Sequence, residues 1–570
     1  MILQALKDYY DRKASDPSSA LAPEGWELKE IPFVIVIGKE GNLIGIDDLR
    51  EGEGRVKRGK SQLVPASVKR SVNITANLLW DTVGYALGVD ARGDEERVKK
   101  QHAAFRERLR DVFGGQPTDG GMVALVKFLE VCDEQLLATS SVWEEAKSNN
   151  AFVSFRLQGE SELVCQRPGV RAVIDAQPRG EADGFCLVSG NRDKVAVLHP
   201  AIKGIRGGQP TGTNIVSFNL PAFESYGKEQ GANAPVGEVA TRAYTTALNH
   251  LLSKDSRQKM GVGDSTVVFW AEKPSGVVVE EAFAAWFDPP RDEPDAGAAK
   301  VKALYEFKHG KPLSGDDDQR FFVLGLSPNA ARVSVRFWQV ATIRELGERV
   351  FQHFQDLEIT LPPKAPRYPS LYRLLSSIAA QQEAKNIPPN LAGDWMRSIL
   401  SGAPYPQTLL QAALRRSRAE REVSPLRAAL IKACLNRSRS GREEDLHVSL
   451  DLTNANTGYR LGRLFAAFEK IQEEANPGIN ATIRDRYFGS ASASPLVAFP
   501  ILNRLKNHHL AKLENRGRAV NFERLIGEVM GGLDATNPFP PSLSLADQGR
   551  FAVGYYHQRQ KFFEKSEGEK

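Results

Sequence analysis

Long apolar runs are missing from this chain of 570 residues. No stretch of about 18 apolar residues occurs, so we expect no transmembrane helix. The opening MILQALKDYYDRKASDP has too short an apolar stretch and too many acids for a secretory signal peptide. These absences predict a cytoplasmic protein.

Clustered cysteines are also missing. Cys132, Cys165, Cys186 and Cys434 stand singly, without a CxxC pair and without a histidine at ligand spacing. Zinc sites and disulfide frameworks depend on such groups. We therefore expect four reduced thiols in the core, and neither a metal nor another cofactor.

Motifs that carry catalysis are absent as well. The chain has no GxxxxGK[ST] phosphate loop, no HExxH, no GxSxG and no His-Asp dipeptide. Its nine histidines are scattered, and the adjacent pair His508 and His509 lies in a basic stretch. The sequence predicts a protein that is not an enzyme, while a site assembled from distant residues stays open.

The residues that are present are patterned as an α+β protein. Residues 31–50, IPFVIVIGKEGNLIGIDDLR, contain two β-rich runs around a GKEGN turn, which predicts a hairpin. Apolar residues at helical spacing predict helical insertions at residues 76–112, 121–148 and 236–253. Short β-rich runs predict further strands at residues 149–158, 171–177, 184–190, 195–202, 214–220, 264–272, 318–328 and 331–339.

A proline-rich stretch, LEITLPPKAPRYPSL at residues 357–371, predicts a domain boundary. We expect a strand-rich α+β domain over residues 1–370 and an all-α helical bundle over residues 371–570. In the bundle, residues 458–475 place Leu461, Leu464, Phe465, Phe468 and Ile471 on one helical stripe, and Arg460, Arg463 and Lys470 opposite them. This pattern predicts a helix with a cationic outer face.

Positive charge is concentrated towards the end of the chain. Residues 401–570 hold 25 Lys and Arg against 18 Asp and Glu, and residues 411–440 hold eight cations against two acids. Such a density favours a phosphate backbone as partner. A solvated helix face is the open alternative.

A second cationic stretch, within residues 54–88, precedes a Trp-bearing segment that we expect to be helical. Its cations are Arg55, Lys57, Arg58, Lys60, Lys69 and Arg70. A loop of this kind is either solvated or neutralises phosphates. In the second case the amides of Gln62, Asn73 and Asn77 can reach base edges, although Asn77 equally fits a helix N-cap.

The segment from residue 201 to 252 is the richest in glycine and polar residues. Lys203 and Arg206 flank Gly204, Gly207 and Gly208, and Gln209 and Asn214 follow. Such glycines either turn N–H groups towards an anion or simply let the chain bend. Further on, we expect Phe223 and Tyr226 to anchor a loop to the core, with Gln230 and Asn233 as candidate backbone caps.

Several long motifs resemble a known family. The motifs MILQALKDYYDR, KRSVNITANLLWDTVGYALG, VSFNLPAFESYGKEQGANAPVGEVATRAYTTALNHLL, GDSTVVFWAE, FFVLGLSPNAARVSVRFW and GYRLGRLFAAFEKIQEEA are similar to the Csd-type large subunit of the type I-C CRISPR surveillance complex, Cascade. The resemblance spans nearly the whole chain and is weakest in residues 287–319 and 371–450.

The resemblance implies a subunit without catalytic activity in an RNA-guided DNA-binding complex of the bacterial cytoplasm. Its N-terminal domain would contact the Cascade backbone, recognise the protospacer-adjacent motif in duplex DNA and promote unwinding. Guide RNA would then read the target in an R-loop, and a separate helicase-nuclease would be recruited. We assign contact with the DNA motif to the cationic stretch and its amide side chains. We assign binding of the opened strand to residues 204–212, with Lys203 and Arg206 on its phosphates.

The C-terminal bundle of the family is implied to hold the displaced strand. In this chain the cations expected to do so are Arg415, Arg416, Arg418, Lys432, Arg437, Arg439, Arg460 and Arg463. The family also implies a separate small subunit from an internal start, here residues 448–570 beginning at Val448. A nucleic-acid-processing enzyme and a scaffold without direct DNA contact remain the alternatives.

Overall fold

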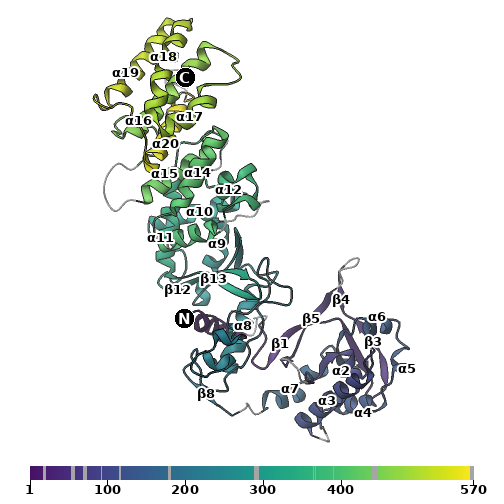
Figure 1. Ribbon diagram of the computed structural model, residues 1–570. Coiled ribbons are helices and arrows are strands. Elements are labelled where there is room, and N and C mark those ends of the chain that lie inside the picture. The colour runs from purple at the N-terminus through teal and green to yellow at the C-terminus, as the bar shows by residue number, and fades with distance from the viewer. Residues whose placement is uncertain are drawn as a thin grey trace. The chain divides into compact units, whose positions relative to one another are not determined.

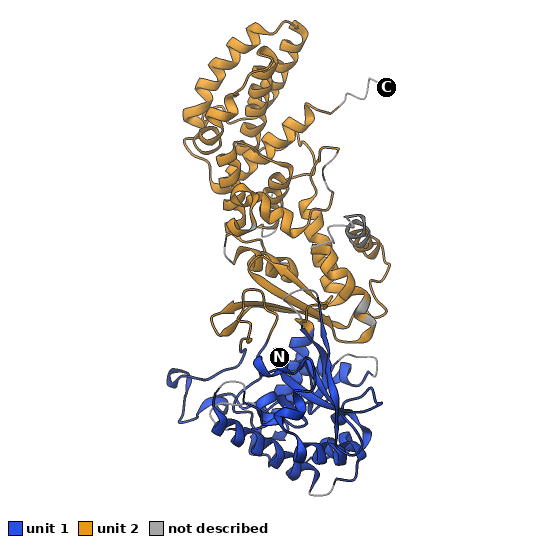
Figure 2. Cartoon of the chain, turned by 90° about the vertical axis from the view of Figure 1, so that its right-hand side faces the viewer, with its two compact units in different colours: residues 1–202, 214–250 blue, residues 203–213, 251–570 orange. Residues whose placement is uncertain are grey.

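The computed structural model describes residues 1–16, 21–52, 58–68, 74–90, 93–114, 117–177, 181–287, 294–363, 365, 367–388, 390–438 and 446–564. The chain forms two compact units (Figure 2). Unit 1 comprises residues 1–202 and 214–250, and unit 2 comprises residues 203–213 and 251–570. The predicted boundary near residue 370 lies inside unit 2, because one hydrophobic core joins Met260 to Tyr556 there.

Unit 1 mixes short strands and helices. Its helices are α1 (Ile2–Ala14), α2 (Val83–Leu87), α3 (Glu95–Phe113), α4 (Gly120–Val131), α5 (Glu134–Leu137), α6 (Trp143–Ser148), α7 (Pro168–Asp175) and α8 (Glu238–Leu251). Its strands are β1 (Trp26–Ile31), β2 (Phe33–Ile37), β3 (Leu43–Asp48), β4 (Arg50–Glu51), β5 (Arg58–Pro65), β6 (Trp80–Thr82), β7 (Phe152–Leu157), β8 (Gly184–Phe185) and β9 (Arg192–Asp193).

The main core of unit 1 is built on a four-stranded sheet in the order β3–β2–β7–β6. The hairpin predicted at residues 31–50 is confirmed, since β2 pairs antiparallel with β3. On its other side β2 pairs in parallel with β7, and every residue of its FVIVI sequence is buried. Rings from two helices pack on β7: Phe105 of α3 and Phe128 of α4 each lie 6.3 Å from Phe155.

Unit 2 begins with an antiparallel sheet in the order β10–β11–β12–β13. Its strands are β10 (Lys259–Val262), β11 (Ser265–Ala271), β12 (Arg320–Asn329) and β13 (Arg332–Thr342). Helices α9 (Val277–Phe287), α10 (Pro294–Lys308) and α11 (Ile343–Leu357) accompany this sheet. The ring of Phe269 on β11 lies 4.6 Å from that of Phe283 on α9, which fixes this helix to the sheet.

The remaining helices of unit 2 form the bundle, drawn green to yellow in Figure 1. They are α12 (Leu371–Ile378), α13 (Leu391–Ser401), α14 (Gln407–Glu420), α15 (Pro425–Arg437), α16 (Thr457–Ala475), α17 (Ile483–Ala493), α18 (Pro495–Lys512), α19 (Arg516–Gly531) and α20 (Leu545–Lys561). The expected α+β class, with helices filling the C-terminal part, is confirmed.

Helix α16 lies at the centre of this bundle. It packs against α17, α18, α19 and α20. Its contact with α20 is so close that a Cβ on Gly462 would lie 2.1 Å from the carbonyl oxygen of Phe551, and one on Gly554 would lie 2.2 Å from that of Tyr459. Because neighbours cover it on several sides, the prediction that α16 has a cationic outer face is wrong.

Some sequence-based elements are confirmed and others are wrong. Strands are found as expected in residues 149–158, 264–272, 318–328 and 331–339, although the last two strands continue to Asn329 and Thr342. Most of residues 171–177 instead belong to α7, which ends at Asp175, since Pro168 opens a helix that turns Val170 and Ile174 towards the core. Residues 195–202 and 214–220 contain isolated bridges without a strand, and residues 76–82 form a loop and β6 before the helices begin.

All four cysteines are free thiols, and Cys165, Cys186 and Cys434 are buried as expected. Burial raises the pKa of Cys165 to about 12, so this thiol stays protonated at neutral pH. Among the helices that the structure describes, none is both long enough and apolar enough to cross a membrane.

Candidate nucleic-acid interface

Strand β5 carries two of the predicted phosphate-binding cations. It pairs antiparallel with β1, from Trp26 opposite Pro65 to Ile31 opposite Lys60, and its first residues pair with β4 (Figure 1). Arg58 and Lys60 are both exposed and stand two residues apart, so they belong to the same face of the strand. Over residues 58–65 the cationic stretch is therefore a strand and not a loop.

Glycine at position 59 lets β5 approach the chain between β1 and β2. A Cβ on Gly59 would lie 2.6 Å from the backbone nitrogen of Pro32 and 2.7 Å from the carbonyl carbon of Ile31. No side chain fits that gap unless the backbone moves. The glycine thus fixes the position of the two cations on either side of it.

These cations differ from their neighbour Arg50 in their partners. Arg50 Nη2 lies 2.7 Å from both Asp48 Oδ2 and Glu145 Oε2, and these hydrogen bonds raise its pKa. In the part of the chain that the structure describes, neither Arg58 nor Lys60 forms an ion pair, although Arg58 lies opposite Glu51. Among the described residues, no ion pair uses the charges of Arg58 and Lys60, whereas the charge of Arg50 is used internally.

The prediction that Asn77 reads base edges is wrong, as is its alternative role as a helix N-cap. Its side chain is 4% exposed, and its Oδ1 accepts a hydrogen bond of 3.0 Å from the backbone N–H of Val68. Its own backbone N–H donates to Asp81 Oδ2 at 2.8 Å. Asn77 therefore fastens residue 68 to the loop before β6.

Of the other residues assigned to duplex DNA, the structure describes Gln62. Gln62 is half-buried on β5, opposite Lys29 of β1. Six further assigned residues lie outside the described residues: Arg55, Lys57, Lys69, Arg70, Asn73 and Arg439. Their assignments stay predictions.

The glycine segment of unit 2 uses its glycines for bending and close approach. Gly204 has φ +85°, and a Cβ there would lie 2.5 Å from the carbonyl oxygen of Leu252. The N–H of Gly208 donates to the carbonyl of Ile205 at 3.0 Å, so it is not turned towards an external anion. These contacts favour a connection that has to bend, which was the open alternative to a phosphate nest.

The side chains around these glycines still offer polar contacts. Lys203, Arg206 and Gln209 are exposed, and the backbone N–H of Arg206 donates to Thr266 Oγ1 at 3.0 Å. Gly207 has φ +75°, the left-handed region that favours glycine. Asn214, the last residue assigned to this group, is half-exposed and belongs to unit 1.

Two of the cations assigned to the displaced strand lie in the core, so the assignment of Lys432 and Arg463 to a surface is wrong. Both residues are 3% exposed. Lys432 Nζ donates to the carbonyl oxygen of Asp356 at 3.0 Å, and Arg463 Nε donates to Gln558 Oε1 at 3.2 Å. Burial also lowers the pKa of Arg463.

Four more of these cations have partners inside the chain. Arg416 pairs with Glu420 at 3.3 Å, and Arg418 donates to Gln548. Arg437 pairs with Asp356 at 3.3 Å, and Arg460 Nε donates to the carbonyl oxygen of Asn454 at 2.8 Å. Arg415 on α14 is exposed and forms no ion pair with any described residue.

Sequence reasoning missed the cationic side of α18. Arg504, His508 and Lys512 recur at four-residue spacing on this helix and are exposed, and Arg516 follows on α19. None of the three Arg and Lys side chains forms an ion pair with another residue that the structure places. Cations also suit the C-terminal end of any helix, which is the alternative for Lys512. The signal was present in the sequence as NRLKNHHLAKLENRGR, residues 503–518.

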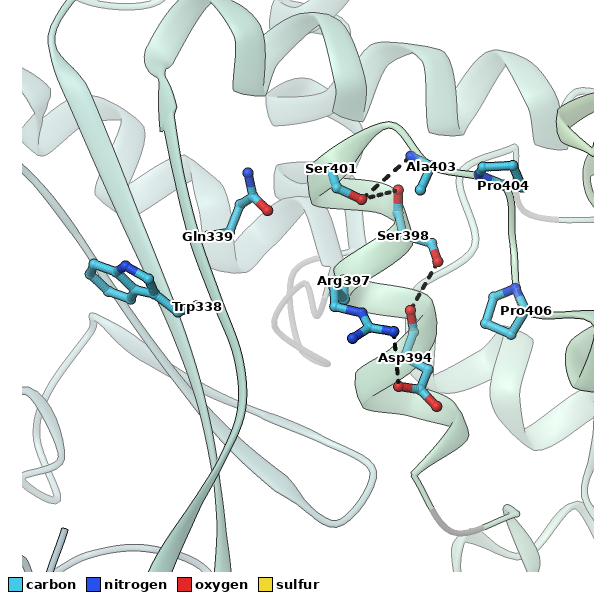
Figure 3. A pocket seen from close by; sticks show the side chains of 9 residues that line it. All are labelled: Trp338, Gln339, Asp394, Arg397, Ser398, Ser401, Ala403, Pro404 and Pro406. Carbon is cyan, nitrogen blue, oxygen red and sulfur yellow. Dashed lines mark hydrogen bonds and ion pairs between the residues drawn. The ribbon is translucent and has the colours of Figure 1, made fainter. Parts of the chain in front are cut away.

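A shallow pocket of about 490 Å³ lies between β13 and α13 (Figure 3). Trp338 and Gln339 line it from the strand, where Gln339 points towards the helix and the ring of Trp338 points to the other side, and Asp394, Arg397 and Ser398 line it from the helix. Arg397 pairs with Asp394 at 3.8 Å, and Ser398 Oγ donates to the carbonyl oxygen of Asp394 at 3.0 Å. These polar groups interact with one another, and neither a histidine nor a cysteine joins them to form an acid–base pair.

Comparison with known proteins identifies the class of this chain as a CRISPR-associated protein. The family model described as CRISPR-associated protein (Cas_Csd1) matches residues 6–563. The chain therefore belongs to the CRISPR-associated Csd1 family, which confirms the resemblance found in its sequence motifs. No curated protein matches it.

Proposed function

We propose that this protein is the non-catalytic large subunit of a type I-C Cascade of the bacterial cytoplasm, and that it recognises the protospacer-adjacent motif in duplex DNA. The match of residues 6–563 to the Csd1 family carries this proposal. In this role the chain joins CRISPR RNA and the other Cascade subunits. It helps to open the duplex, and a recruited helicase-nuclease degrades the target.

The first step is electrostatic capture of the duplex by strand β5, through Arg58 and Lys60. Arg58 and Lys60 are exposed, lie on one face and have no ion-pair partner among the described residues. Each phosphate that such a cation neutralises releases condensed counterions, so binding weakens as salt rises. These contacts position the duplex but do not distinguish base sequences.

The second step is reading of the motif by amide side chains on or close to strand β5. Asn77 is excluded, since its Oδ1 already accepts from Val68 and the residue is buried. Gln62 on the same strand and Asn73 remain the amides assigned to this step. Lys203 and Arg206 of the glycine segment are assigned to phosphates of the opened strand.

The displaced strand is held by the bundle, over a surface different from the one first expected. Burial removes Lys432 and Arg463 from that surface, and internal partners occupy Arg437 and Arg460. The cations that support strand binding are Arg415 and those of the α18 side, namely Arg504, Lys512 and Arg516. A track of this kind tolerates any base sequence, because it contacts only phosphates.

The family resemblance also implies a companion protein. Residues 448–570 contain α16 to α20, the helices that pack around one another at the end of unit 2. We assign this segment to a small subunit made from an internal start at Val448. A synonymous or conservative change of that codon should remove a companion band of about 14 kDa, and a band that persists would contradict the assignment.

The proposal is tested by charge reversal on β5 in the assembled complex. With Arg58→Glu and Lys60→Glu combined, we expect weaker binding of motif-containing duplex. The slope of log affinity against log salt should fall by about 2, because roughly 0.9 is contributed per lost phosphate contact. Binding is measured by fluorescence anisotropy at several salt concentrations.

The matched control is a second pair of exposed lysines. Lys302 and Lys308 on α10 are six residues apart and exposed, so Lys302→Glu with Lys308→Glu changes the net charge by the same amount. This control should keep the slope of the unmodified complex. If both pairs give the same affinity and slope, the protein is a scaffold without direct duplex contact at β5. Cleavage of DNA by the purified chain would contradict the non-catalytic role.

A further inference from the structure

Tyr226 is the most exposed tyrosine side chain that the structure describes. It is 97% exposed, so the expectation that it anchors its loop to the core is wrong. Its φ of +55° lies in the left-handed region, and Gly227 follows with φ +69°. A bulky residue adopts this conformation only when its surroundings hold it there. The loop thus presents an aromatic ring to the outside at a cost in backbone energy.

A single amide side chain holds this loop in shape. Asn233 Oδ1 accepts from the N–H of Ser225 at 2.9 Å, while its Nδ2 donates to the carbonyls of Lys228 at 2.9 Å and Gln230 at 3.0 Å. The N–H of Lys228 also donates to the carbonyl of Ser225 at 3.1 Å, which closes the turn around Tyr226. The expected role of Asn233 as a backbone cap is therefore confirmed.

The base of the loop is equally fixed. A Cβ on Gly231 would lie 2.1 Å from the carbonyl oxygen of Ala196, so the chain passes this point with no space for a side chain. The neighbouring N–H of Ala234 donates to the carbonyl of Gly231 at 3.1 Å. Because these contacts favour one conformation of the loop, little conformational entropy remains to be lost on binding.

Further large apolar side chains are exposed in the same region of unit 1. They are Phe185, Leu187, Val197, Leu198, Leu220 and Phe223. Residues 181–202 and 214–236 contain little regular structure beyond two-residue strands and 3-10 turns, and the local core is small. A region that leaves so many apolar side chains exposed is typical of a surface that a partner covers.

The charge of this region identifies the kind of partner. Residues 181–202 and 214–236 hold three Lys and Arg against five Asp and Glu. Glu224 and Glu229 flank Tyr226 and Lys228 within the loop itself. A protein surface that binds nucleic acid carries excess positive charge, whereas a surface that binds another protein combines aromatic anchors with few charges at its centre. A protein surface with an apolar pocket fits these residues, and a polyanion does not.

We propose that the turn from Ser225 to Lys228 inserts the ring of Tyr226 into an apolar pocket of a protein subunit of the RNA-containing particle that this chain joins. The inference rests on the proposed membership of Cascade, but not on the proposed contact between β5 and DNA. Tyrosine is a frequent hot-spot residue, because a rigid ring fills a pocket at small entropic cost. Asn233 acts as the positioning residue that keeps the ring ready.

The test uses the full-length chain and a particle assembled from CRISPR RNA and the other Cascade subunits without this chain, in the absence of DNA. Binding is measured by biolayer interferometry. Tyr226→Ala should weaken binding by about tenfold or more, as expected for loss of a hot-spot side chain. Tyr226→Phe should change it by less than about threefold, because the ring that fills the pocket is retained.

Two controls accompany these variants. Tyr372→Ala removes an exposed tyrosine from α12 and should leave binding unchanged. Asn233→Ala keeps the ring but frees the loop, so binding should fall while the amides of residues 225–230 lose protection from hydrogen exchange. Thermal unfolding of Tyr226→Ala should match that of the unmodified chain, since the side chain is exposed.

The inference is overturned if Tyr226→Ala binds the particle as tightly as the unmodified chain. It is also overturned if the variant loses affinity only when duplex DNA is added, which would make the ring a nucleobase contact. A loss of self-association alone would identify a second copy of this chain as the partner and would overturn it too.

The Arg58→Glu and Lys60→Glu chain should bind the DNA-free particle normally, so failure at β5 and failure at Tyr226 give different results. If the unmodified chain does not bind the particle, membership of the complex fails together with the inference.

Discussion

Arg437 on α15 lies 3.3 Å from the carboxylate of Asp356 on α11, measured from Nη1 to Oδ2. Lys432, also on α15, donates to the carbonyl oxygen of that same Asp356. The hydroxyl of Tyr405 accepts a further hydrogen bond of 2.6 Å from Arg437 Nη1. Two cations that the sequence assigned to a DNA strand thus join two helices of unit 2.

Removal of the carboxylate should leave the Arg437 guanidinium buried without its counter-charge. For Asp356→Ala we expect a loss of about 3 kcal/mol in the free energy of unfolding of unit 2, as is typical when one partner of a buried pair is deleted. Urea unfolding followed by circular dichroism measures this change. The matched control is Asp318→Ala, which breaks an exposed pair with Arg344. That control should cost less than about 1 kcal/mol, and an equal loss in both variants would contradict the structural role of Asp356.

Gly59 should be intolerant of any side chain. In Gly59→Ala the new methyl group meets the backbone of Pro32, so β5 has to shift, and we expect unit 1 to lose about 1–3 kcal/mol of stability. Faster hydrogen exchange of the amides in residues 58–65 would report the shift directly. Gly45→Ala on β3 is the matched control, because a Cβ there has nothing within 4 Å. Unchanged exchange in Gly59→Ala would show that the two strands can separate freely.

The sequence predicted the sheets best where apolar residues run continuously and a turn is marked. FVIVI and the GKEGN turn define β2 and β3, because a central strand buries both of its faces. The strand predicted at residues 171–177 is wrong for a local reason. Pro168 starts a helix in which Val170 and Ile174 share one face. Short apolar runs do not distinguish strand from helix by composition alone.

The candidate site was less predictable, because charge on a helix does not reveal what covers it. Arg463 lies opposite the apolar stripe of α16, but the glycines at positions 458 and 462 let α20 approach that helix closely. That spacing of glycines indicated close helix packing. The position of the cations did not indicate that their side of α16 faces solvent. Tyr226 could not be located from sequence, since its exposure follows from hydrogen bonds of Asn233 across the loop.

The cations of α18 should contribute to single-strand binding more than those first assigned. For Arg504→Ala combined with Lys512→Ala we expect weaker binding of single-stranded DNA by the assembled complex. The salt slope should fall by about 1.4, from roughly 0.7 per lost phosphate contact on a single strand. Arg463→Ala should instead lower thermal stability and leave the slope unchanged in the folded protein, because Arg463 is buried. Lys302→Ala with Lys308→Ala serves as the charge control, and an equal slope change in that pair would exclude a specific role for α18.

The stability of unit 2 should fall in mild acid because of two buried histidines. Burial, with a smaller effect of Arg437, lowers the pKa of His353 to about 3, and its Nδ1 lies 2.6 Å from the hydroxyl of Tyr405. Burial likewise lowers the pKa of His557 to about 4. An unfolded histidine titrates near 6.5, so below about pH 6.5 the unfolded chain binds protons that the folded chain does not. Stability is therefore complete above that pH and is lost progressively as the pH falls.

Between pH 7 and pH 5 each of these histidines should cost about 2 kcal/mol in the free energy of unfolding, since the folded state stays unprotonated over that range. His353→Asn keeps a polar atom near Tyr405 but removes the titrating group. This variant should be less stable at pH 7 and should lose less stability on acidification than the unmodified chain. The control His309→Asn replaces an exposed histidine and should retain the full pH dependence. If His353→Asn loses as much stability between pH 7 and pH 5 as His309→Asn does, protonation of His353 is not what limits the fold in acid.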